Sequence, residues 1–238
     1  MSSNALKRII NKDLKELKNM NLDKLGIHVI FDEGNMLKAH AMIIGPENTP
    51  FEDGVLYFEI EFPTNYPFSP PSILYYSESR YRIHPNLYVG RSKENYLGKV
   101  CLSIINTWSG PKWTTVQHIG SVLLSIQSLL CENPLHNEPG FETEIGIRND
   151  SYNKIVLYDT YRTLILRNCF SIPEKYECFK NIIKDHLSKN KDRIISRLIY
   201  LKKENPKPVK ITINIYNLSV PIEYEKLSKS IEYNLNLI

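Results

Sequence analysis

The residues with the clearest chemical potential lie around a single cysteine. Cys101 stands in the segment Gly98–Ile104, between a short glycine turn and an apolar run. His84-Pro85-Asn86 lies upstream, and two tryptophans frame a turn at 108–113 downstream. A thiol in an irregular segment, with an amide donor and a rigid aromatic frame nearby, indicates covalent thioester chemistry. A thiolate suits that chemistry because it is both a good nucleophile and a good leaving group.

Cys101 also has a simpler interpretation, as a small side chain buried in a hydrophobic core. The two interpretations differ in one requirement, because a sulfur atom that carries an acyl group must be reachable from the surface. The other cysteines, Cys131, Cys169 and Cys178, are scattered and form no Cys-x-x-Cys pair. This spacing argues against a zinc ribbon, so we expect no metal, and free thiols in a reducing compartment.

The composition is that of an ordinary soluble globular protein. The chain has 238 residues, 42% hydrophobic and 24% charged, enough for one domain with or without an appendage. Its net charge of +4 does not suggest the dense basic stripe of a nucleic-acid binder. No run approaches the roughly 18 apolar residues that span a bilayer, and residues 1–18 contain no signal-peptide core. We expect a cytoplasmic protein, with the nucleus as an alternative, and neither nucleic-acid nor membrane partners.

Upstream of the cysteine, the pattern predicts one helix followed by a sheet. Residues 3–18 place apolar side chains at helical spacing, with basic residues on the other faces. Alternating apolar residues then predict four strands, at 27–31, 36–44, 55–62 and 73–76. Their close succession favours an antiparallel meander, with a rigid proline-rich connector at 63–71. Residues 77–114 lack periodicity, and an irregular segment of that length is usually functional.

Downstream of the cysteine, the pattern is mainly helical. A central buried helix is predicted from a cap at Thr114 or Thr115 to about Cys131. A polar loop follows at 132–142. Further elements are then predicted, namely helices at 150–168, 174–188, 189–203 and 223–235 and a strand at 210–216.

The character of the chain changes beyond Ser188, where a basic helix begins. This change predicts a core domain at 1–188 and a C-terminal α/β extension at 189–238. The predicted fold class is therefore α+β, with the extension packed on the core or hanging from it.

The order of these segments resembles the ubiquitin-conjugating enzymes. Four ordered motifs carry the resemblance: Gly45-Pro46 with Thr49–Gly54, Phe62–Pro71, His84–Tyr88 and Gly98–Ile104. Residues 107–113 and 132–142 are more specifically similar to the large subgroup typified by ubiquitin-conjugating enzyme E2 Z, which also has a C-terminal extension. The resemblance covers about residues 3–188. It implies the UBC fold, with an N-terminal helix, a four-stranded antiparallel meander sheet, a central helix and C-terminal helices.

The resemblance implies that Cys101 accepts ubiquitin, or a ubiquitin-like modifier, from an activating enzyme by thioester exchange. Cys101 would then pass the acyl group to a lysine of a protein substrate or to a cysteine of a ligase. The activating enzyme would use the ATP, so no cofactor is expected on this chain. Asn86 would donate a hydrogen bond to the oxyanion or brace the loop around Cys101, and both roles stay open. His84 and Pro85 would support the site as a turn.

The same resemblance implies further contacts. His136 and Asn137 would line the gate for the incoming amine, with an ordinary polar surface loop as the alternative. Three basic residues of the first predicted helix would contact the activating enzyme: Lys7, Arg8 and Lys12. The alternative for these basic residues is a solvated face of a packed helix.

A ligase would dock on Phe68, Thr114 and Thr115, although Phe68 could instead pack in the core. Two departures from the family pattern affect this part of the chain. The usual Ser-Pro-Ala is replaced by Thr114-Thr115-Val116, which leaves the choice of ligase open. Asn86 and Cys101 are 15 residues apart (101 − 86) rather than about eight, so residues 91–95 are expected to form a surface bulge near the site.

Two other functions compete with the acyl carrier. An inactive ubiquitin-binding scaffold of the same fold is one, although such relatives lack the cysteine that this chain has. A cysteine hydrolase that uses Cys101, His84 and Asn86 is the other. No recognised nucleophile motif surrounds Cys101, and no regular element precedes His84 to aim it, so this alternative has less support.

Overall fold

The computed structural model describes residues 4–90 and 95–238. The chain divides into two compact units, which we call unit 1 and unit 2. Unit 1 comprises Met1–Pro46, Leu56–Arg80 and Asn86–Cys131. Unit 2 comprises Glu47–Val55, Tyr81–Pro85 and Glu132–Ile238. The predicted boundary at residue 188 therefore falls inside unit 2.

Unit 1 begins with the predicted N-terminal helix. It consists of α1 (Asn4–Arg8), a π-helical turn η1 (Ile9–Asp13) and α2 (Leu14–Asn19), followed by the short 3₁₀ helix η2 (Leu22–Leu25). Ala5 and Ile9 are fully buried, which agrees with the apolar stripe in the sequence. The helix predicted over residues 3–18 is confirmed for its described residues, 4–18.

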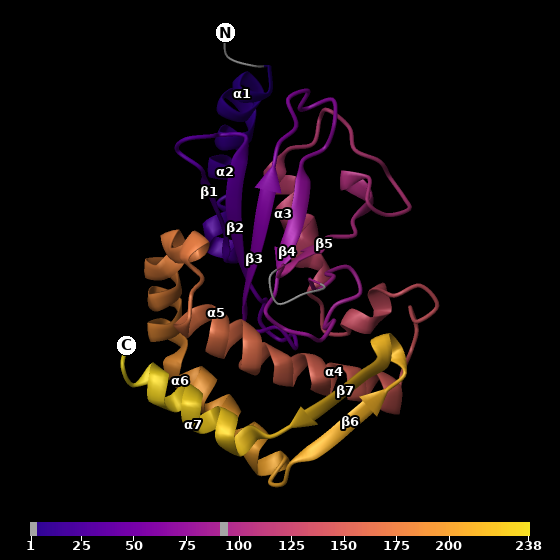
Figure 1. Cartoon of the computed structure of the whole chain (residues 1–238), viewed down its shortest axis with the longest axis vertical. Helices are drawn as coiled ribbons and strands as arrows, with labels where there is room; N and C mark the ends of the chain where they lie inside the picture. The colour runs from indigo at the N-terminus through magenta and orange to yellow at the C-terminus, as the bar shows by residue number, and fades with distance from the viewer. Residues whose placement is uncertain (1–3, 91–94) are drawn as a thin grey trace. The chain divides into compact units, whose positions relative to one another are not determined.

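In the described part of the chain, the sheet has five strands, which lie in sequence order (Figure 1). They are β1 (Ile27–Phe31), β2 (Lys38–Ile44), β3 (Val55–Glu61), β4 (Ser72–Tyr76) and β5 (Leu97–Lys99). The four predicted strands and the antiparallel meander are confirmed, since β1–β2, β3–β4 and β4–β5 all pair antiparallel. The sequence missed β5 because three residues with a central glycine give no alternating pattern.

Gly98 lies in β5 and not in the glycine turn that the sequence suggested. A Cβ atom at this position would come within 1.7 Å of the carbonyl oxygen of Tyr88. The glycine therefore lets the chain at Tyr88 lie directly against β5, where the Tyr88 amide donates to the carbonyl of Lys99 at 3.0 Å. Leu87 and Val100, the next residue pair, form an isolated antiparallel β-bridge.

The carboxylate of Asp13 is fully buried and joins three segments of unit 1. Its Oδ1 accepts hydrogen bonds from the Tyr66 hydroxyl at 2.6 Å and from the amide of Ile119, the first residue of α3, at 3.0 Å. Its Oδ2 lies 3.4 Å from Nε of Arg8. Burial and the bond to Asp13 raise the pKa of Tyr66. The first helix, the proline-rich connector and α3 are thereby held at one point.

The central helix α3 (Ile119–Leu129) is shorter than predicted. His118 is its N-cap and accepts from the Ser121 amide at 3.4 Å, so the predicted cap at Thr114 or Thr115 is wrong. Thr114 instead forms a turn with Gln117, whose side chain accepts from the Thr114 amide at 2.8 Å. The apolar stripe of α3 is buried as predicted. The short helix η3 (Ser103–Ile105) precedes it along the chain.

Unit 2 contains the later helices and a hairpin (Figure 1). The helices are η4 (Pro134–Asn137), α4 (Ile147–Asp159), the π-helical η5 (Thr160–Ile165), α5 (Leu166–Phe170), η6 (Glu174–Phe179), α6 (Lys180–Glu204) and α7 (Tyr224–Leu235). Strands β6 (Val209–Ile213) and β7 (Leu218–Ile222) form an antiparallel pair, joined by η7 (Ile215–Asn217). The hairpin contacts α4, and α7 packs along α6. An α+β fold with an α/β extension is thus confirmed.

Two predictions for this part of the chain were wrong. The helices predicted at 174–188 and 189–203 are largely one helix, α6, which runs through Ser188 without a break. The segment contains no glycine or proline at that point, and its buried face continues from Leu187 to Ile194. Strand β7 was missed because Pro221 and the following acidic residues obscured its alternation.

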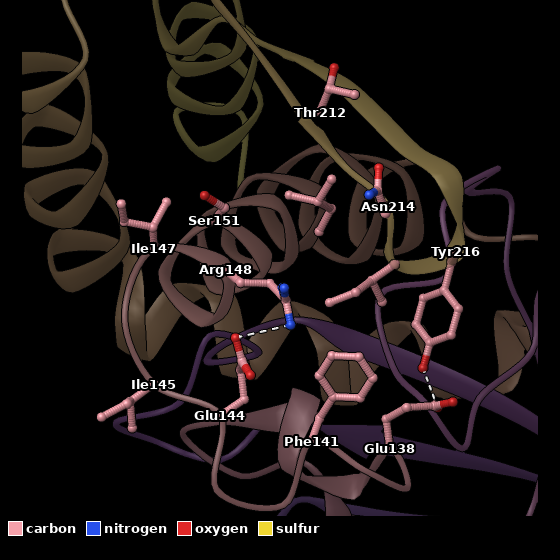
Figure 2. A pocket seen from close by; sticks show the side chains of 12 residues that line it. Glu138, Phe141, Glu144, Ile145, Ile147, Arg148, Ser151, Thr212, Asn214 and Tyr216 are labelled. Carbon is pink, nitrogen blue, oxygen red and sulfur yellow. Dashed lines mark hydrogen bonds and ion pairs between the residues drawn. The ribbon is translucent and has the colours of Figure 1, made fainter.

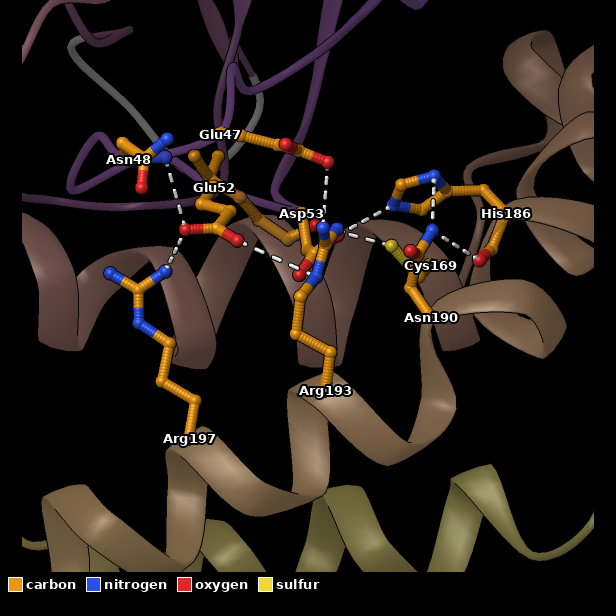
Figure 3. Close-up of polar contacts among 10 residues, drawn as sticks. Glu47, Asn48, Glu52, Asp53, Cys169, His186, Asn190, Arg193 and Arg197 are labelled. Atoms are coloured by element: carbon orange, nitrogen blue, oxygen red, sulfur yellow. Dashed lines mark hydrogen bonds and ion pairs between the residues drawn. The ribbon is translucent and has the colours of Figure 1, made fainter.

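Helix α6 is fastened within unit 2 by a cluster of charged side chains (Figure 3). His186 and Arg193 contact Oδ1 of the buried Asp53, at 3.0 and 2.5 Å. Arg193 also contacts Glu47 at 2.7 Å, and Arg197 binds Glu52. Burial opposes ionisation of Asp53, but the bonds from His186 and Arg193 outweigh it and hold the pKa of Asp53 below 3.8.

We predict that Asp13→Ala destabilises the protein by about 3 kcal/mol, because it leaves a half-buried guanidinium and a buried hydroxyl without their partner. Urea unfolding at pH 7 measures the loss. Asp23→Ala, at an exposed position of η2, is the control and should change stability by less than about 0.5 kcal/mol. Equal stabilities for the two variants would contradict the linking role of Asp13.

We predict a specific acid sensitivity from Asp53. Because its folded pKa is lowered, ionised Asp53 stabilises the native state above pH 3.8, and this contribution is lost as the pH falls through the lower folded value. Asp53→Asn should therefore be less stable than the wild type at pH 7, and the difference should shrink as the pH falls below 3.8. Chemical unfolding across that range tests this. Asp185→Asn, exposed on α6, should show neither effect.

Candidate active site

Asn86 and Cys101 lie side by side in unit 1 although they are 15 residues apart in the sequence. The Cys101 amide donates to the Asn86 carbonyl at 2.8 Å. In return, Nδ2 of Asn86 donates to the Cys101 carbonyl at 2.8 Å. This reciprocal pair is the bracing contact, one of the two roles that the sequence left open for Asn86. The oxyanion role would require the same amide to turn toward the sulfur during the reaction.

Thr107 braces the other side of the cysteine, and sequence reasoning gave it no role. Its Oγ1 accepts from the Leu102 amide at 2.8 Å and donates to the Val100 carbonyl at 2.7 Å. The hydroxyl therefore satisfies backbone groups on both sides of Cys101, where no ladder continues. The available signal was a threonine at a turn, since such hydroxyls often bind nearby backbone groups.

The side chain of Cys101 is buried, with 2% of the residue exposed, and Asn86 is 7% exposed. This contradicts our expectation of a reachable sulfur in the resting conformation. The bracing bonds explain part of it, because they draw residues 86 and 100–102 tightly together. Any acyl transfer at Cys101 therefore requires local opening around the thiol.

The tryptophan turn forms the expected rigid frame. Nε1 of Trp113 donates to the Pro67 carbonyl at 2.7 Å, and its amide donates to Oδ1 of Asn106 at 3.0 Å. The Trp113 ring also lies 5.8 Å from that of Tyr66. These contacts tie the turn after the cysteine to the proline-rich connector.

The residues predicted to meet a ligase lie on the surface of unit 1. Phe68 is 74% exposed, so the alternative that it packs in the core is wrong. Thr114 and Thr115 are exposed, as is the neighbouring Val116. Exposed aromatic rings of this kind often mark protein contacts, and the binding role of Phe68 stays a prediction.

The basic side chains of the first helix are not equivalent. Lys7 is exposed, whereas Arg8 and Lys12 are half-buried. Arg8 donates to the carbonyl of Gln117 at 2.8 Å, and Lys12 to that of Val116 at 3.3 Å. Two of the three residues predicted to contact an activating enzyme thus also hold the turn before α3.

His84 and Pro85 belong to unit 2. His84 is fully buried, with its ring 5.8 Å from that of Phe51. The Pro85 carbonyl accepts a hydrogen bond from the Arg82 guanidinium. The supporting role of both residues stays a prediction. The full burial of His84 gives a hydrolytic base at this position no exposed surface.

His136 and Asn137 lie in η4 and are half-buried. Nε2 of His136 is 2.8 Å from the Glu144 carbonyl, and Asn137 donates to the Pro134 carbonyl at 3.3 Å. Both side chains thus brace the loop that carries them. Their role as gate residues stays a prediction.

Residues 91–94 of the expected surface bulge lie outside the described residues, and Asn95 at its end is exposed. Across residues 4–90 and 95–238, no group of three or more His, Cys, Asp or Glu side chains could hold a metal ion. Within the same ranges, no helix combines the length and apolar character required to cross a bilayer.

Comparison with known proteins agrees with the motifs. The model of the ubiquitin-conjugating enzyme family matches residues 9–156, which include Asn86 and Cys101. Ubiquitin-conjugating enzyme E2 Z of Xenopus tropicalis is 40% identical over 156 residues, covering 64% of this chain and 47% of the relative. The human E2 Z is 43% identical over 143 residues, covering 59% of this chain and 38% of the relative.

The similarity extends to a nematode relative. The probable ubiquitin-conjugating enzyme protein 17 of Caenorhabditis elegans is 37% identical over 179 residues, covering 72% of this chain and 24% of the relative. The match thus spans less than half the length of each of these relatives. The family model ends at residue 156, so a domain boundary at 188 stays a prediction. Since the model covers more than half of the chain, the protein belongs to the ubiquitin-conjugating enzyme family.

Proposed function

We propose that this chain is a transferase that carries ubiquitin, or a ubiquitin-like modifier, as a thioester on Cys101. The observation that carries the proposal is the pair of reciprocal hydrogen bonds between Asn86 and Cys101, within the region that matches the family model. A side-chain amide beside a cysteine is the arrangement that thioester aminolysis needs, because the tetrahedral intermediate bears a negative oxygen.

The reaction would proceed in two acyl transfers. The Cys101 thiolate attacks the carbonyl carbon of the thioester on an activating enzyme, the C–S bond to that enzyme breaks, and its thiolate leaves. A substrate amine or a ligase thiolate then attacks the new thioester, and Cys101 leaves as thiolate. In aminolysis the attacking amine nitrogen also loses a proton, which passes to solvent. His136 or Asn137 would help to orient the incoming amine. ATP is used by the activating enzyme, so this chain needs no cofactor.

We also propose binding partners and a cellular location. Lys7, with Arg8 and Lys12, would meet the activating enzyme, and Phe68 with Thr114 and Thr115 would meet a ligase. The protein would act in the cytoplasm or the nucleus, where glutathione keeps its thiols reduced.

One observation favours a second candidate function, an inactive scaffold that binds ubiquitin without carrying it. Cys101 is only 2% exposed, and a sulfur atom that stays covered cannot exchange acyl groups. The two candidates differ in whether the segments around Cys101 open in solution and expose its sulfur atom. Each therefore makes a different prediction for the reactivity of Cys101.

We predict that the protein, incubated with activating enzyme, ATP and ubiquitin, forms an adduct that a reducing agent removes. Cys101→Ser should instead give a stable ester or no adduct, because an oxygen ester is not cleaved by thiols under these conditions. Gel electrophoresis with and without reductant reads out both. Cys178→Ser, at an exposed position, is the matched control and should charge normally. An adduct only with a ubiquitin-like modifier would keep the chemistry and change the cargo.

We predict that native Cys101 reacts with iodoacetamide faster than Cys169, although both are buried. Burial raises the pKa of the Cys169 thiol, so this residue should stay unmodified until the protein unfolds. Exposed Cys178 should react first. Mass spectrometry of the labelled peptides over time gives the order. If Cys101 is as unreactive as Cys169, the carrier function is contradicted and the scaffold is supported.

A further inference from the structure

A cavity of about 900 Å³ lies beside strand β6 in unit 2 (Figure 2). Its volume is in the upper part of the range that ligand-binding pockets occupy. One wall is formed by residues between 138 and 151, from the loop before α4 and the first turns of that helix. The other wall is the end of β6 with η7. The proposed transferase reaction gives none of these residues a part.

The cavity follows the edge of β6 and not one of its faces. Thr212 and Ile213 both line it, and so does Asn214 directly after the strand. Successive side chains of a strand point to opposite faces, so a cavity lined by two consecutive residues lies at the strand's edge. In the described part of the chain, β6 pairs with β7 alone, so no strand lies beside this edge. An edge of this kind can pair with a strand from another chain.

The register of the hairpin indicates which backbone groups point to the open edge. Lys210 is opposite Pro221, and proline has no N–H to donate to a neighbouring strand. This pair therefore fits the non-hydrogen-bonded position of the ladder, and so does the pair Thr212–Ser219 two residues further on. The hydroxyl oxygens of Thr212 and Ser219 are 3.0 Å apart, which agrees with the close spacing of such pairs. Lys210 and Thr212 thus direct their N–H and C=O groups away from β7.

The outer edge of β7 is a poorer template for pairing. Because the nitrogen of Pro221 carries no hydrogen and points away from β6, this edge lacks one donor. Proline on an edge strand is a common way to prevent pairing with other chains. Strand β6 contains no proline. The hairpin therefore has one blocked edge and one open edge, and the open edge is the one beside the cavity.

The wall opposite β6 carries two isoleucines that are almost fully exposed. Ile145 is 84% exposed and Ile147 is 86% exposed. Between them, a Cβ atom on Gly146 would meet no atom within 4 Å, so this part of the wall is open. Phe141 and Ile215 add apolar surface to the cavity. Exposed apolar side chains gathered in this way mark a site for another molecule, so the cavity favours an occupant with apolar side chains.

The charged side chains around the cavity are balanced. Glu144 lies 3.4 Å from Arg148, and Glu138 lies 3.9 Å from Arg82. Glu138 also accepts a hydrogen bond from the Tyr216 hydroxyl, as Figure 2 shows. Each carboxylate thus has a cation of its own. An occupant needs no charge at this end of β6.

The start of β6 has a different charge. Lys207 and Lys210 are both exposed there. Antiparallel strands pair slightly more stably than parallel ones, so we take the added strand to run opposite to β6. Its first residues then lie at the cavity and its last residues beside the two lysines. Charge complementarity therefore favours an occupant whose apolar residues are followed by acidic ones.

We propose that β6 binds an extended segment of another protein, which adds as a third strand to the β6–β7 sheet. The segment runs antiparallel to β6, fills the cavity with apolar side chains and places acidic residues beside Lys207 and Lys210. Hydrogen bonds between the two main chains give the affinity, and the cavity with the two lysines gives the specificity. This inference does not depend on the chemistry proposed for Cys101.

The probe is the peptide Val-Thr-Val-Thr-Val-Glu-Glu, amidated and labelled with fluorescein. We predict that the full chain binds it saturably, which fluorescence polarisation measures. A peptide that ends in Lys-Lys instead of Glu-Glu should bind about tenfold more weakly at low salt, because like charges then meet at the start of β6.

Two proline variants form a matched pair that tests the edge itself. Thr212→Pro removes an N–H from the open edge of β6 and should weaken peptide binding about tenfold. Ser219→Pro removes the corresponding N–H from the outer edge of β7 and should change binding by less than about twofold. Both substitutions remove the 3.0 Å contact between the two hydroxyls, so the variants differ in the edge that they block.

A second measurement uses the wild-type chain and so does not depend on how the variants fold. Two versions of the peptide carry N-methyl groups on alternate amides, one version for each edge of the added strand. Only one edge of that strand faces β6, so one version should bind about tenfold more tightly than the other.

Several results would overturn the inference. The absence of saturable binding by the wild type is one, and equal binding of the two methylated peptides is another. Equal losses in folded Thr212→Pro and Ser219→Pro would indicate a structural effect of the hairpin and not an edge contact. If sedimentation shows a wild-type dimer that Thr212→Pro separates, the occupant of the edge is a second copy of this chain and the proposed partner is wrong.

Discussion

The carboxylate of Asp13 is the point on which unit 1 depends. A charge without exposed surface is costly unless hydrogen bonds and an opposite charge compensate for it, and Asp13 has both in Tyr66, the Ile119 amide and Arg8. Its position at the start of α3 adds a favourable interaction with the helix dipole. One buried group thus sets the places of the first helix, the connector and α3, and with them the exposed ring of Phe68.

The active-site region uses the same principle in a different form. Its segments are irregular, so many carbonyl groups have no partner in a helix or sheet ladder. Side chains take that place: Asn86 binds the carbonyl of Cys101, and Thr107 that of Val100. These hydrogen bonds hold the backbone on both sides of Cys101. The cost is a covered thiol, because bonds that define the backbone around a cysteine also close the space beside it.

How much the sequence revealed depended on the range of the interactions involved. Strong local periodicity predicted the first helix, four strands and the stripe of α3, and ordered motifs identified the family and the pairing of Asn86 with Cys101. Contacts between distant residues left no local pattern. Asp13 was therefore passed over beside its basic neighbours, and β5 was too short to alternate. The exposure of Cys101 depends on all the residues that surround it in the fold, and no sequence motif encodes that environment.

Helix α6 has a consequence for how this chain can vary. His186, Asn190, Arg193 and Arg197 share one face of a 25-residue helix about 37 Å long, and three of them bind acidic residues of the 47–55 loop (Figure 3). Each residue advances a helix by about 100°, so a single insertion between His186 and Arg193 would turn the second half of this face away from its partners. The helix therefore fixes the spacing of these contacts. Homologues that keep the charged face can exchange residues along it, but they can gain or lose length only in loops before or after it.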